Sequence, residues 1–420
     1  MLNSPISKPR GGPLTPSPAA PSLFTSRYPI RICESMGSEV TAHPRTPHPV
    51  TRCIPPGQRS PSMTIAARPW LDEIQAYRPG TRSASADGSM ASNESPLGAS
   101  PKLGDSIAKA LAGVHRYPDP LADELRSQLA GLHGVHPEQI LIGNGSDELI
   151  FLLSTTFLAQ GGHAVCADPA YQIDRIGALS VNATITQVPL RDWKHDLAAM
   201  AALRADIAYI VNPHNPTGTT RSRAEIDTFT AESPAHLVVV DEAYIDFTTD
   251  PEALTAIPLV AGGRVAVLRT FSKIHGLAGL RVGYLVADSA IIAAIRKVRA
   301  PFSVGSLAQA AALAALADTG HREAVREHTL RLRGQLVDLL ACHGLHAVES
   351  EANFVLLPVP DENAFVAGLR THGVSVRPGS ALGAPGTVRI SVPTEAGLEL
   401  LRSALHHTHP ANHRETANHR

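Results

Sequence analysis

Short runs of apolar residues, each about as long as a β-strand, recur through the middle of this chain and alternate with stretches of helical periodicity. Such near-continuous apolar runs are typical of parallel strands that are buried on both faces of a sheet. The runs lie at residues 207–211, 238–240 and 265–268, and helical patterns follow at residues 291–298 and 307–316. The alternation predicts an α/β fold in which helices flank a mostly parallel central sheet.

The chain of 420 residues is longer than one hydrophobic core usually supports. Apolar runs at residues 354–357 and 388–392 predict the strands of a second, smaller α+β unit. We therefore expect a large domain over residues 111–305 and a small C-terminal domain over residues 306–405. Residues 63–110 are expected to form an N-terminal segment that joins the small domain.

The two ends of the chain lack any apolar periodicity that would build a core. Residues 1–62 are rich in Pro, Ser, Thr and Arg, and residues 406–420 are rich in His, Asn and Arg, so we expect both to be disordered. A basic, Ser-rich and acid-poor segment is also typical of organellar transit peptides. The structured pattern that begins after Met63 favours instead an over-extended start or a disordered tail, and a cytoplasmic protein.

The balance of charge excludes several classes of partner. Lys and Arg number 37 against 38 Asp and Glu, so no strong field would attract nucleic acid or a membrane surface, and the expected partners are small-molecule substrates. The four cysteines show no metal-ligand spacing, which predicts a reducing compartment and no metal site. No apolar run reaches the length of about 18 residues that a transmembrane helix needs.

Lys273 follows the apolar run at residues 265–268, after a short turn that contains two hydroxyl side chains. Ligands of α/β sheets bind at the carboxyl ends of strands, so Lys273 lies where a ligand is expected. The hydroxyls of Thr270 and Ser272 and the guanidinium of Arg281 are suited to bind one phosphate group. A solvated surface lysine is the alternative that this motif leaves open.

Asp241 ends the apolar run at residues 238–240. A carboxylate at the end of a buried strand needs a partner, because an unpaired buried charge is unfavourable. The protonated nitrogen of a pyridine ring would be such a partner. The pair would keep the ring electron-withdrawing, as the chemistry of pyridoxal 5′-phosphate (PLP) requires. A helix N-cap is the alternative function of an aspartate at this place.

Three further motifs follow predicted strands. Asn215 precedes Pro216 and is biased away from helical geometry, which lets its amide donate to a phenolic oxygen of a ligand. Small residues and a capping Ser146 precede an apolar helix, and a helix N-terminus of this kind binds phosphate. The third glycine of a dinucleotide fingerprint is missing there, which argues against a nicotinamide dehydrogenase. Tyr171 is suited to stack on a flat ring.

From about residue 66 to residue 405, the chain resembles the fold-type I PLP-dependent aminotransferases, and among them the histidinol-phosphate aminotransferase family. The fold class that this resemblance implies is a large PLP-binding domain with a smaller α+β domain. Besides the motifs above, the resemblance rests on Met90-Ala91-Ser92-Asn93-Glu94-Ser95-Pro96-Leu97-Gly98, Arg116-Tyr117-Pro118-Asp119, Asn215-Pro216-Thr217-Gly218, Asp241-Glu242-Ala243-Tyr244 and Ser350-Glu351-Ala352-Asn353-Phe354.

The resemblance implies a role for each residue near the cofactor ring. Lys273 would hold PLP as a Schiff base and then move a proton at the substrate α-carbon. Asp241 would pair with the pyridinium, Asn215 and Tyr244 would reach the phenolic oxygen, and Tyr171 would cover the ring. Together Lys273, Asp241 and Tyr244 are the expected catalytic residues.

The resemblance also implies how the cofactor phosphate is bound. Tyr117 would reach the phosphate in the neighbouring subunit, so a homodimer with two shared sites is expected. Within the subunit, the phosphate would be held by backbone groups of Ser146 and Asp147 and by the side chains of Thr270, Ser272 and Arg281.

Substrate binding is expected at Arg389, Arg377, Asn353 and Tyr77. In proteins of this family, an arginine at the position of Arg389 clamps the carboxylate of an amino acid through both guanidinium nitrogens. With histidinol phosphate, Arg389, Arg377 and Tyr77 would contact the phosphate ester instead. Glutamate and 2-oxoglutarate would be the second substrate pair.

Departures from the family pattern leave alternatives open. His214 stands where the family usually has Asn, and Ile274-His275 replaces an alanine and an aromatic residue, but we expect neither to alter the chemistry. The turn at residues 377–386 is short and apolar, as in aminotransferases of phenylalanine and other aromatic amino acids. A threonine-phosphate decarboxylase is a more distant alternative. A PLP-binding transcription regulator is disfavoured, because no helix-turn-helix precedes Met63.

Overall fold

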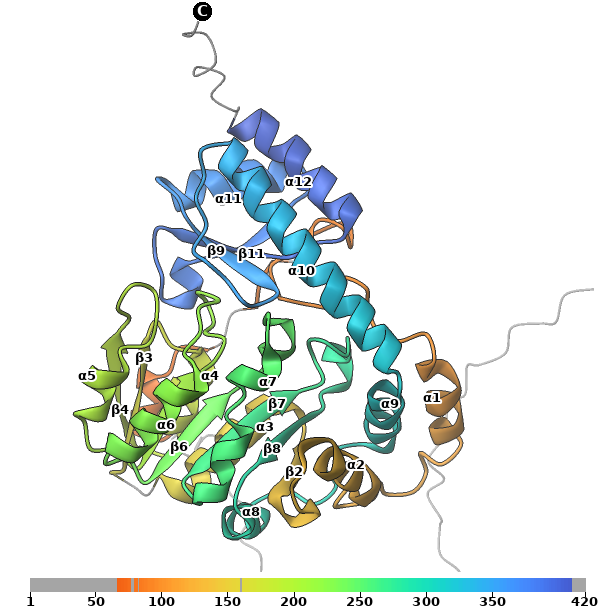
Figure 1. Ribbon diagram of the computed structural model, residues 1–420, viewed down its shortest axis with the longest axis vertical. Helices are drawn as coiled ribbons and strands as arrows, with labels where there is room; N and C mark the ends of the chain where they lie inside the picture. The colour runs from red at the N-terminus through yellow and green to blue at the C-terminus, as the bar shows by residue number, and fades with distance from the viewer. Residues whose placement is uncertain (1–65, 77–78, 82, 159–160, 410–420) are drawn as a thin grey trace, which may run out of the picture. The chain divides into compact units, whose positions relative to one another are not determined.

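The larger of the two β-sheets in the described part of the chain has helices on both of its faces (Figure 1). The computed structural model describes residues 66–76, 79–81, 83–158 and 161–409. In this part of the chain, the large sheet has seven strands in the order β2-β8-β7-β6-β5-β3-β4. Their bounds are β2 (Ile140–Gly143), β3 (His163–Asp168), β4 (Thr184–Pro189), β5 (Ile207–Val211), β6 (Leu237–Asp241), β7 (Val265–Thr270) and β8 (Gly283–Val286). Only the pairs that contain β8 are antiparallel, which confirms the expected mostly parallel sheet.

Side chains of the central strands alternate between two hydrophobic cores, because successive residues of a strand point to opposite faces. Tyr209 and Val239 pack in one core with α3 (Gly145–Phe157), α4 (Gln172–Ser180) and α8 (Ser289–Arg296). Ala208 and Val240 pack in the opposite core with α1 (Leu103–Leu111), α2 (Asp123–His133), α6 (Arg223–Glu232) and α9 (Ser306–Ala317). Coverage of both faces explains why these strands are apolar throughout.

The smaller sheet has the strand order β1-β10-β11-β9, with β1 (Ser89–Met90), β10 (Ser375–Pro378), β11 (Thr387–Ser391) and β9 (Phe354–Pro358). The strand β1, from the N-terminal segment, is parallel to β10, and the other pairs are antiparallel. A third core packs this sheet against α10 (Thr319–Cys342), α11 (Glu362–Thr371) and α12 (Glu395–Thr408). Figure 1 shows α10 running from the neighbourhood of α9 to the small sheet.

The structure differs from two of the expected boundaries, the start of the small domain and the start of the C-terminal tail. Ala308 and Ala311 of α9 are buried in the core of the large sheet, so the expected start of the small domain at residue 306 falls inside that core. The expected C-terminal tail begins at residue 406, but α12 continues to Thr408, one further turn after the buried Leu401 and Leu405. The remaining expectations of disorder, at residues 1–62 and 410–420, lie outside the described residues.

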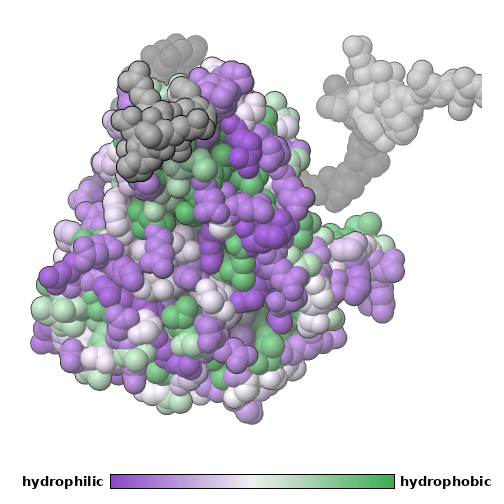
Figure 2. Space-filling model, turned by 45° about the horizontal axis from the view of Figure 1, so that its top comes forward, coloured by the Kyte–Doolittle hydropathy of each residue, from purple (hydrophilic) through white to green (hydrophobic). Residues whose placement is uncertain are grey.

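Short helices fill the connections between the longer elements. No helix among the described residues is long and apolar enough to cross a membrane. Figure 2 shows hydrophilic and hydrophobic residues interspersed over one face of the molecule. The short helices are α5 (Leu197–Ala201), α7 (Pro251–Leu254) and the 3-10 turns Pro69–Glu73, Pro137–Gln139, Ile245–Phe247, Ile257–Gly262, Ala278–Leu280 and Ser380–Leu382.

Four neighbouring parallel strands determine where side chains from distant parts of the chain can meet. The strands β7, β6, β5 and β3 are adjacent and point the same way, so their carboxyl ends lie along one edge of the sheet. Ligands of α/β sheets bind outside that edge. The predicted motifs at Tyr171, Asn215, Asp241 and Lys273 all lie at or just after these strand ends.

Candidate active site

One cavity lies at the carboxyl edge of the large sheet. The turns after β3, β5, β6 and β7 contribute to it, together with the start of α3. The structure thus brings together motifs that are far apart in the sequence. The lining contains every residue predicted to bind the cofactor except Tyr117, namely Ser146, Asp147, Tyr171, Asn215, Asp241, Tyr244, Thr270, Ser272, Lys273 and Arg281.

The start of α3 forms one wall of this cavity. We expected Ser146 to cap the helix, but the N-cap is Asn144, whose backbone N–H donates a 2.5 Å hydrogen bond to the Glu148 carboxylate. The helix therefore starts at Gly145, two residues earlier than a cap at Ser146 would place it. Ser146 therefore lies in the first turn, whose backbone N–H groups have no intrahelical partner. At Gly283, opposite this turn, a Cβ atom would lie only 2.7 Å from the Ser146 nitrogen. Glycine thus permits the close approach of β8 to the helix start.

Positive charge is added beside this helix start by Arg281. Its guanidinium donates to the Asp147 carboxylate over 3.1 Å and to the Ser272 hydroxyl over 3.3 Å. Asp147 also accepts a 2.8 Å hydrogen bond from the hydroxyl of Tyr171. A cation, hydroxyl groups and a helix N-terminus together favour an anion such as phosphate.

Asp241 lies at the end of β6 and is 5% exposed. One carboxylate oxygen accepts a 2.9 Å hydrogen bond from the Ala243 backbone N–H. The pKa of Asp241 is raised from 3.8 to about 7, mainly by burial and also by the nearby Asp147 and Glu242, while the Ala243 N–H and Lys273 act in the opposite direction. A cationic group on a ligand would favour the ionised carboxylate and lower this pKa.

Lys273 extends from the turn after β7 toward the N-terminal segment. Its Nζ donates to the Ser92 backbone carbonyl over 3.3 Å and lies 5.5 Å from the centroid of the Tyr244 ring. The Tyr244 hydroxyl accepts a 3.1 Å hydrogen bond from the amide of Asn93. Ser92 and Asn93 were not singled out as site residues, although they belong to a motif that carried the family resemblance.

Asn93 is held in its place by the small sheet. It has a left-handed backbone conformation with a φ of 54°, is 1% exposed, and exchanges two hydrogen bonds with Ser391 of β11. Asn353 was predicted to bind substrate, but its amide donates to the Asn93 carbonyl over 3.2 Å, and it lines neither cavity of the site. The predicted contact of Asn353 with substrate is thus replaced, in this chain, by a contact with the backbone of Asn93.

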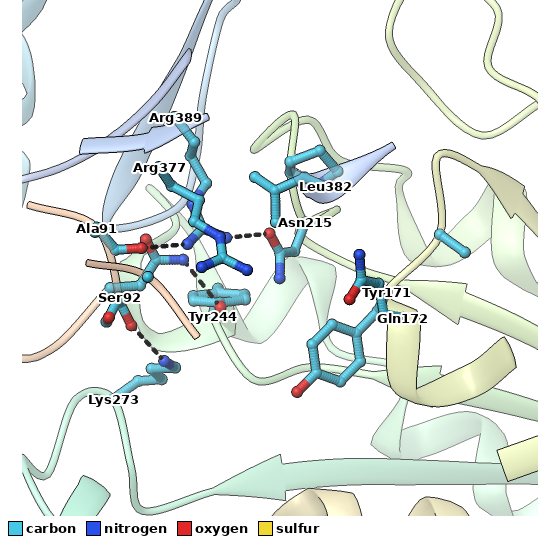
Figure 3. A pocket seen from close by; sticks show the side chains of 14 residues that line it. Ala91, Ser92, Tyr171, Gln172, Asn215, Tyr244, Lys273, Arg377, Leu382 and Arg389 are labelled. Atoms are coloured by element: carbon cyan, nitrogen blue, oxygen red, sulfur yellow. Dashed lines mark hydrogen bonds between the residues drawn. The ribbon is translucent and has the colours of Figure 1, made fainter. Parts of the chain in front are cut away.

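A second cavity adjoins the first and extends toward the small sheet (Figure 3). Arg377 of β10 and Arg389 of β11 are cross-strand partners, and Figure 3 shows both side chains entering this cavity beside Asn215 and Tyr244. They are 3% and 5% exposed, respectively. Gln172 and Leu382 also line the cavity and were not predicted.

Among the described residues, Tyr117 is another predicted residue that lines neither cavity. Tyr117 is 83% exposed, and its ring stacks on Phe302 with centroids 4.6 Å apart. Tyr77 lies outside the described residues. The sequence expectation placed Tyr117 at the phosphate of a neighbouring subunit, and its exposure leaves it accessible to another molecule.

Comparison with known proteins identifies the family. A family model described as Aminotransferase class I and II matches residues 89–405. The histidinol-phosphate aminotransferase of Brevibacillus brevis is 38% identical over 322 residues, which cover 75% of this chain and 88% of that protein. The histidinol-phosphate aminotransferase of Akkermansia muciniphila is 40% identical over 326 residues, which cover 75% of this chain and 89% of that protein.

Solved structures agree with this assignment. The crystal structure of histidinol-phosphate aminotransferase from Sinorhizobium meliloti in complex with pyridoxal-5′-phosphate superposes with a TM-score of 0.75, at 27% identity, and covers 83% of this chain and 98% of that one. The L-threonine-O-3-phosphate decarboxylase of Porphyromonas gingivalis has a TM-score of 0.67 at 22% identity over 76% of this chain and 98% of that one, a likeness in fold alone. This chain belongs to the class I and II aminotransferases, which are PLP-dependent transaminases, and within them to the histidinol-phosphate aminotransferase family.

Proposed function

We propose that this protein transfers the amino group of L-histidinol phosphate to 2-oxoglutarate, with PLP bound at Lys273. The products are imidazole acetol phosphate and L-glutamate, a step of histidine biosynthesis. The names of the relatives support this proposal, as does the pair of buried arginines in the second cavity.

The pair Arg377 and Arg389 is the observation on which the substrate depends. The two residues lie directly opposite each other on antiparallel strands, so their side chains share one face of the small sheet. Guanidinium groups bind a phosphate ester and a carboxylate in the same forked geometry. One pair of arginines therefore suits both histidinol phosphate and glutamate.

The first cavity fits PLP. Its buried carboxylate at Asp241 suits a cationic ring nitrogen, and the start of α3 with Arg281 suits a phosphate. Lys273 supplies the amine to which an aldehyde binds. When bound, PLP supplies an electron-withdrawing pyridinium ring that stabilises negative charge at the substrate α-carbon.

The side chains of the protein then have distinct tasks. The Lys273 Nζ removes the proton from the substrate α-carbon and later returns a proton, as a general base and acid. Asp241 would hold the proton on the ring nitrogen. Asn215 and Tyr244 would donate to the phenolic oxygen of the cofactor, and Tyr171 would cover the ring. Leu382 in the second cavity helps to exclude water from the reacting atoms.

A homodimer is part of this proposal. Exposed apolar side chains occur at the end of α1 and in the segments around Tyr117 and Phe302, whose rings stack on each other. Exposed apolar surface of this kind marks a site for another protein. A second copy of the chain would cover it and bring Tyr117 to the cofactor phosphate of its partner. The exposed members are Leu111 (56%), Val114 (52%), Tyr117 (83%), Val298 (45%) and Phe302 (37%).

An aromatic amino acid aminotransferase is the second candidate. The turn between β10 and β11 places Leu382 in the wall of the second cavity, near Ala170 and Pro216. An apolar wall of this kind also suits a phenyl ring. The two candidates differ in the amino donor, because only histidinol phosphate carries a phosphate ester.

The test is a half-reaction with purified protein loaded with PLP. L-histidinol phosphate or L-phenylalanine is added without any keto acid, and the visible absorption of the bound cofactor is followed. Loss of the visible band with histidinol phosphate, at far lower concentration than with phenylalanine, is the expected result. The reverse order would establish the aromatic enzyme. The variant Lys273→Ala is the control, and it should show neither reaction.

A further inference from the structure

A buried histidine links two of the turns that line the active site. His214 lies directly before Asn215, in the turn after β5, and its side chain is fully buried. Its Nδ1 lies 2.9 Å from the Thr217 hydroxyl in the same turn. Its Nε2 lies 3.1 Å from the backbone carbonyl of Pro169, in the turn after β3. The imidazole thus spans from one strand end to the next.

The direction of both hydrogen bonds follows from the partners. A carbonyl oxygen only accepts, so the Nε2 of His214 carries the proton and donates to Pro169. Burial lowers the pKa of His214 well below its usual value, and the neighbouring His195, whose ring packs edge-on with centroids 4.7 Å apart, lowers it further. The ring is therefore neutral, and Nδ1 accepts from the hydroxyl of Thr217.

The two linked turns hold residues on different sides of the cofactor cavity. The turn after β5 carries Asn215, and the turn after β3 carries Tyr171, two residues beyond Pro169. The far end of Tyr171 is tied to Asp147 through its hydroxyl, at 2.8 Å. The hydrogen bond from His214 to the Pro169 carbonyl holds the backbone of the turn that carries Tyr171. Without it, the ring of Tyr171 could shift relative to the amide of Asn215.

We propose that His214 is a positioning residue, which sets the spacing between the Asn215 amide and the Tyr171 ring through its hydrogen bond to the Pro169 carbonyl. This inference rests on the proposed function, in which Asn215 and Tyr171 contact PLP. The sequence alone had led us to expect no effect of His214 on the chemistry. The structure places its ring between two walls of the cofactor cavity.

Two amide substitutions separate the two hydrogen bonds of His214. The side chain of Asn ends near the position of the histidine Nδ1, so His214→Asn keeps the bond to Thr217 and loses the bond to Pro169. The side chain of Gln reaches the position of Nε2, so His214→Gln keeps the bond to Pro169 and loses the other. The matched control is His133→Asn in α2, which removes the 2.9 Å contact of another histidine with Tyr284, a residue that lines neither cavity.

The measurements are the affinity for PLP and the pH at which the visible band of the bound cofactor changes. The pH at which this band changes depends on the hydrogen-bond donors around the phenolic oxygen of the cofactor. We expect His214→Asn to weaken PLP binding about five- to tenfold, which corresponds to the net free energy of one hydrogen bond. It should also shift the pH midpoint of the band and lower kcat more than it changes KM. We expect His214→Gln and His133→Asn to stay within about twofold of the wild type on each readout.

The outcomes distinguish this inference from the proposed function. If His214→Asn and His214→Gln behave alike while both unfold at similar temperatures, the bond to Pro169 does not position the site and the inference fails alone. A wild-type protein that shows no visible band with PLP would overturn the proposed function and this inference with it. A protein that binds PLP normally but rejects histidinol phosphate would overturn the substrate only, because neither cofactor readout requires that substrate.

Discussion

The guanidinium of Arg389 donates to the side-chain oxygen of Asn215 over 2.6 Å, and so joins the small sheet to the turn after β5. A second nitrogen of the same group donates to the backbone carbonyl of Ala91 over 2.9 Å. Since the amide oxygen of Asn215 accepts from Arg389, its nitrogen is the end that remains for another partner. The proposed substrate clamp therefore also orients the proposed donor to the cofactor.

The substitution Arg389→Lys should lower kcat/KM for the amino donor by about 100-fold, the upper range for hydrogen bonds to a charged group. An ammonium is a point charge and cannot contact Asn215 and Ala91 in the same forked geometry. Steady-state kinetics over a range of donor concentrations measure this effect. The control is Arg331→Lys on α10. The side chain of Arg331 is half-exposed and pairs with Glu395. Equal kinetics for both variants would contradict the role of Arg389.

Asp241 should make the stability of the cofactor-free protein depend on pH. Its pKa is raised from 3.8 to about 7 by burial, so the native state keeps a proton that the unfolded chain has lost between these values. The unfolding free energy should therefore fall as the pH rises from about 4 to 7, by roughly 4 kcal/mol from this group. Asp241→Asn removes the titrating group and should abolish that part of the slope.

Urea unfolding at several pH values, with wild type and Asp241→Asn in parallel, measures this difference. The exposed Asp338→Asn is the control and should leave the slope unchanged. In PLP-loaded protein the sign should reverse, because a cationic ring nitrogen favours the ionised carboxylate. An identical pH dependence for wild type and Asp241→Asn without cofactor would show that Asp241 ionises normally in the folded protein.

The strand ends account for what could be predicted of the site from sequence. Lys273, Asp241 and Asn215 each follow an apolar run, and parallel strands bring their carboxyl ends to one edge, so local patterns were sufficient to place them. Asn93 escaped prediction because its partner Ser391 is 298 residues away in the chain. Contacts of that range leave no periodic pattern in the sequence. Gln172 and Leu382 reach the second cavity through the packing of the two sheets, which local patterns do not describe either.

Long-range packing also explains why the expected domain boundary at the start of α9 was wrong. The alanine-rich pattern of this helix correctly predicted a helix, but alanine does not specify which core the helix joins. Ala308 and Ala311 pack beside α1, whose Leu103 lies in the core of the large sheet. The capping residue of α3 was missed for a similar reason, since the choice of Asn144 over Ser146 depends on a hydrogen bond to the Glu148 side chain.

A buried ion pair at the end of β7 should be important for stability. Arg269 donates to Glu242 over 2.8 Å, with side-chain exposures of 11% and 0%. The carboxylate also accepts from the Ala256 backbone and the Thr255 hydroxyl. We expect Glu242→Ala to lower the unfolding free energy by about 3–5 kcal/mol, because it leaves a buried guanidinium without its main counter-charge.

The double substitution Glu242→Leu with Arg269→Met is the comparison for this pair. It removes both charges and fills a similar volume, so it should be less destabilising than Glu242→Ala alone. Urea unfolding of the wild type, Glu242→Ala and the double variant at one pH gives the order of their unfolding free energies. A double variant that is less stable than the single one would show that the hydrogen bonds of this pair outweigh the burial of an unpaired charge.

Tyr117 offers a test of the shared site that does not require a structure of the dimer. If Tyr117 acts across the interface, a mixed dimer of Tyr117→Ala and Lys273→Ala has one intact site, formed by the Lys273 of one subunit and the Tyr117 of its partner. Random exchange of equal amounts should then restore about one quarter of wild-type activity at limiting PLP, where each variant alone is nearly inactive. If Tyr117 acted within its own subunit, mixing would restore nothing. The variant Trp193→Ala replaces another exposed aromatic residue, which is 40% exposed, and should keep its activity without mixing.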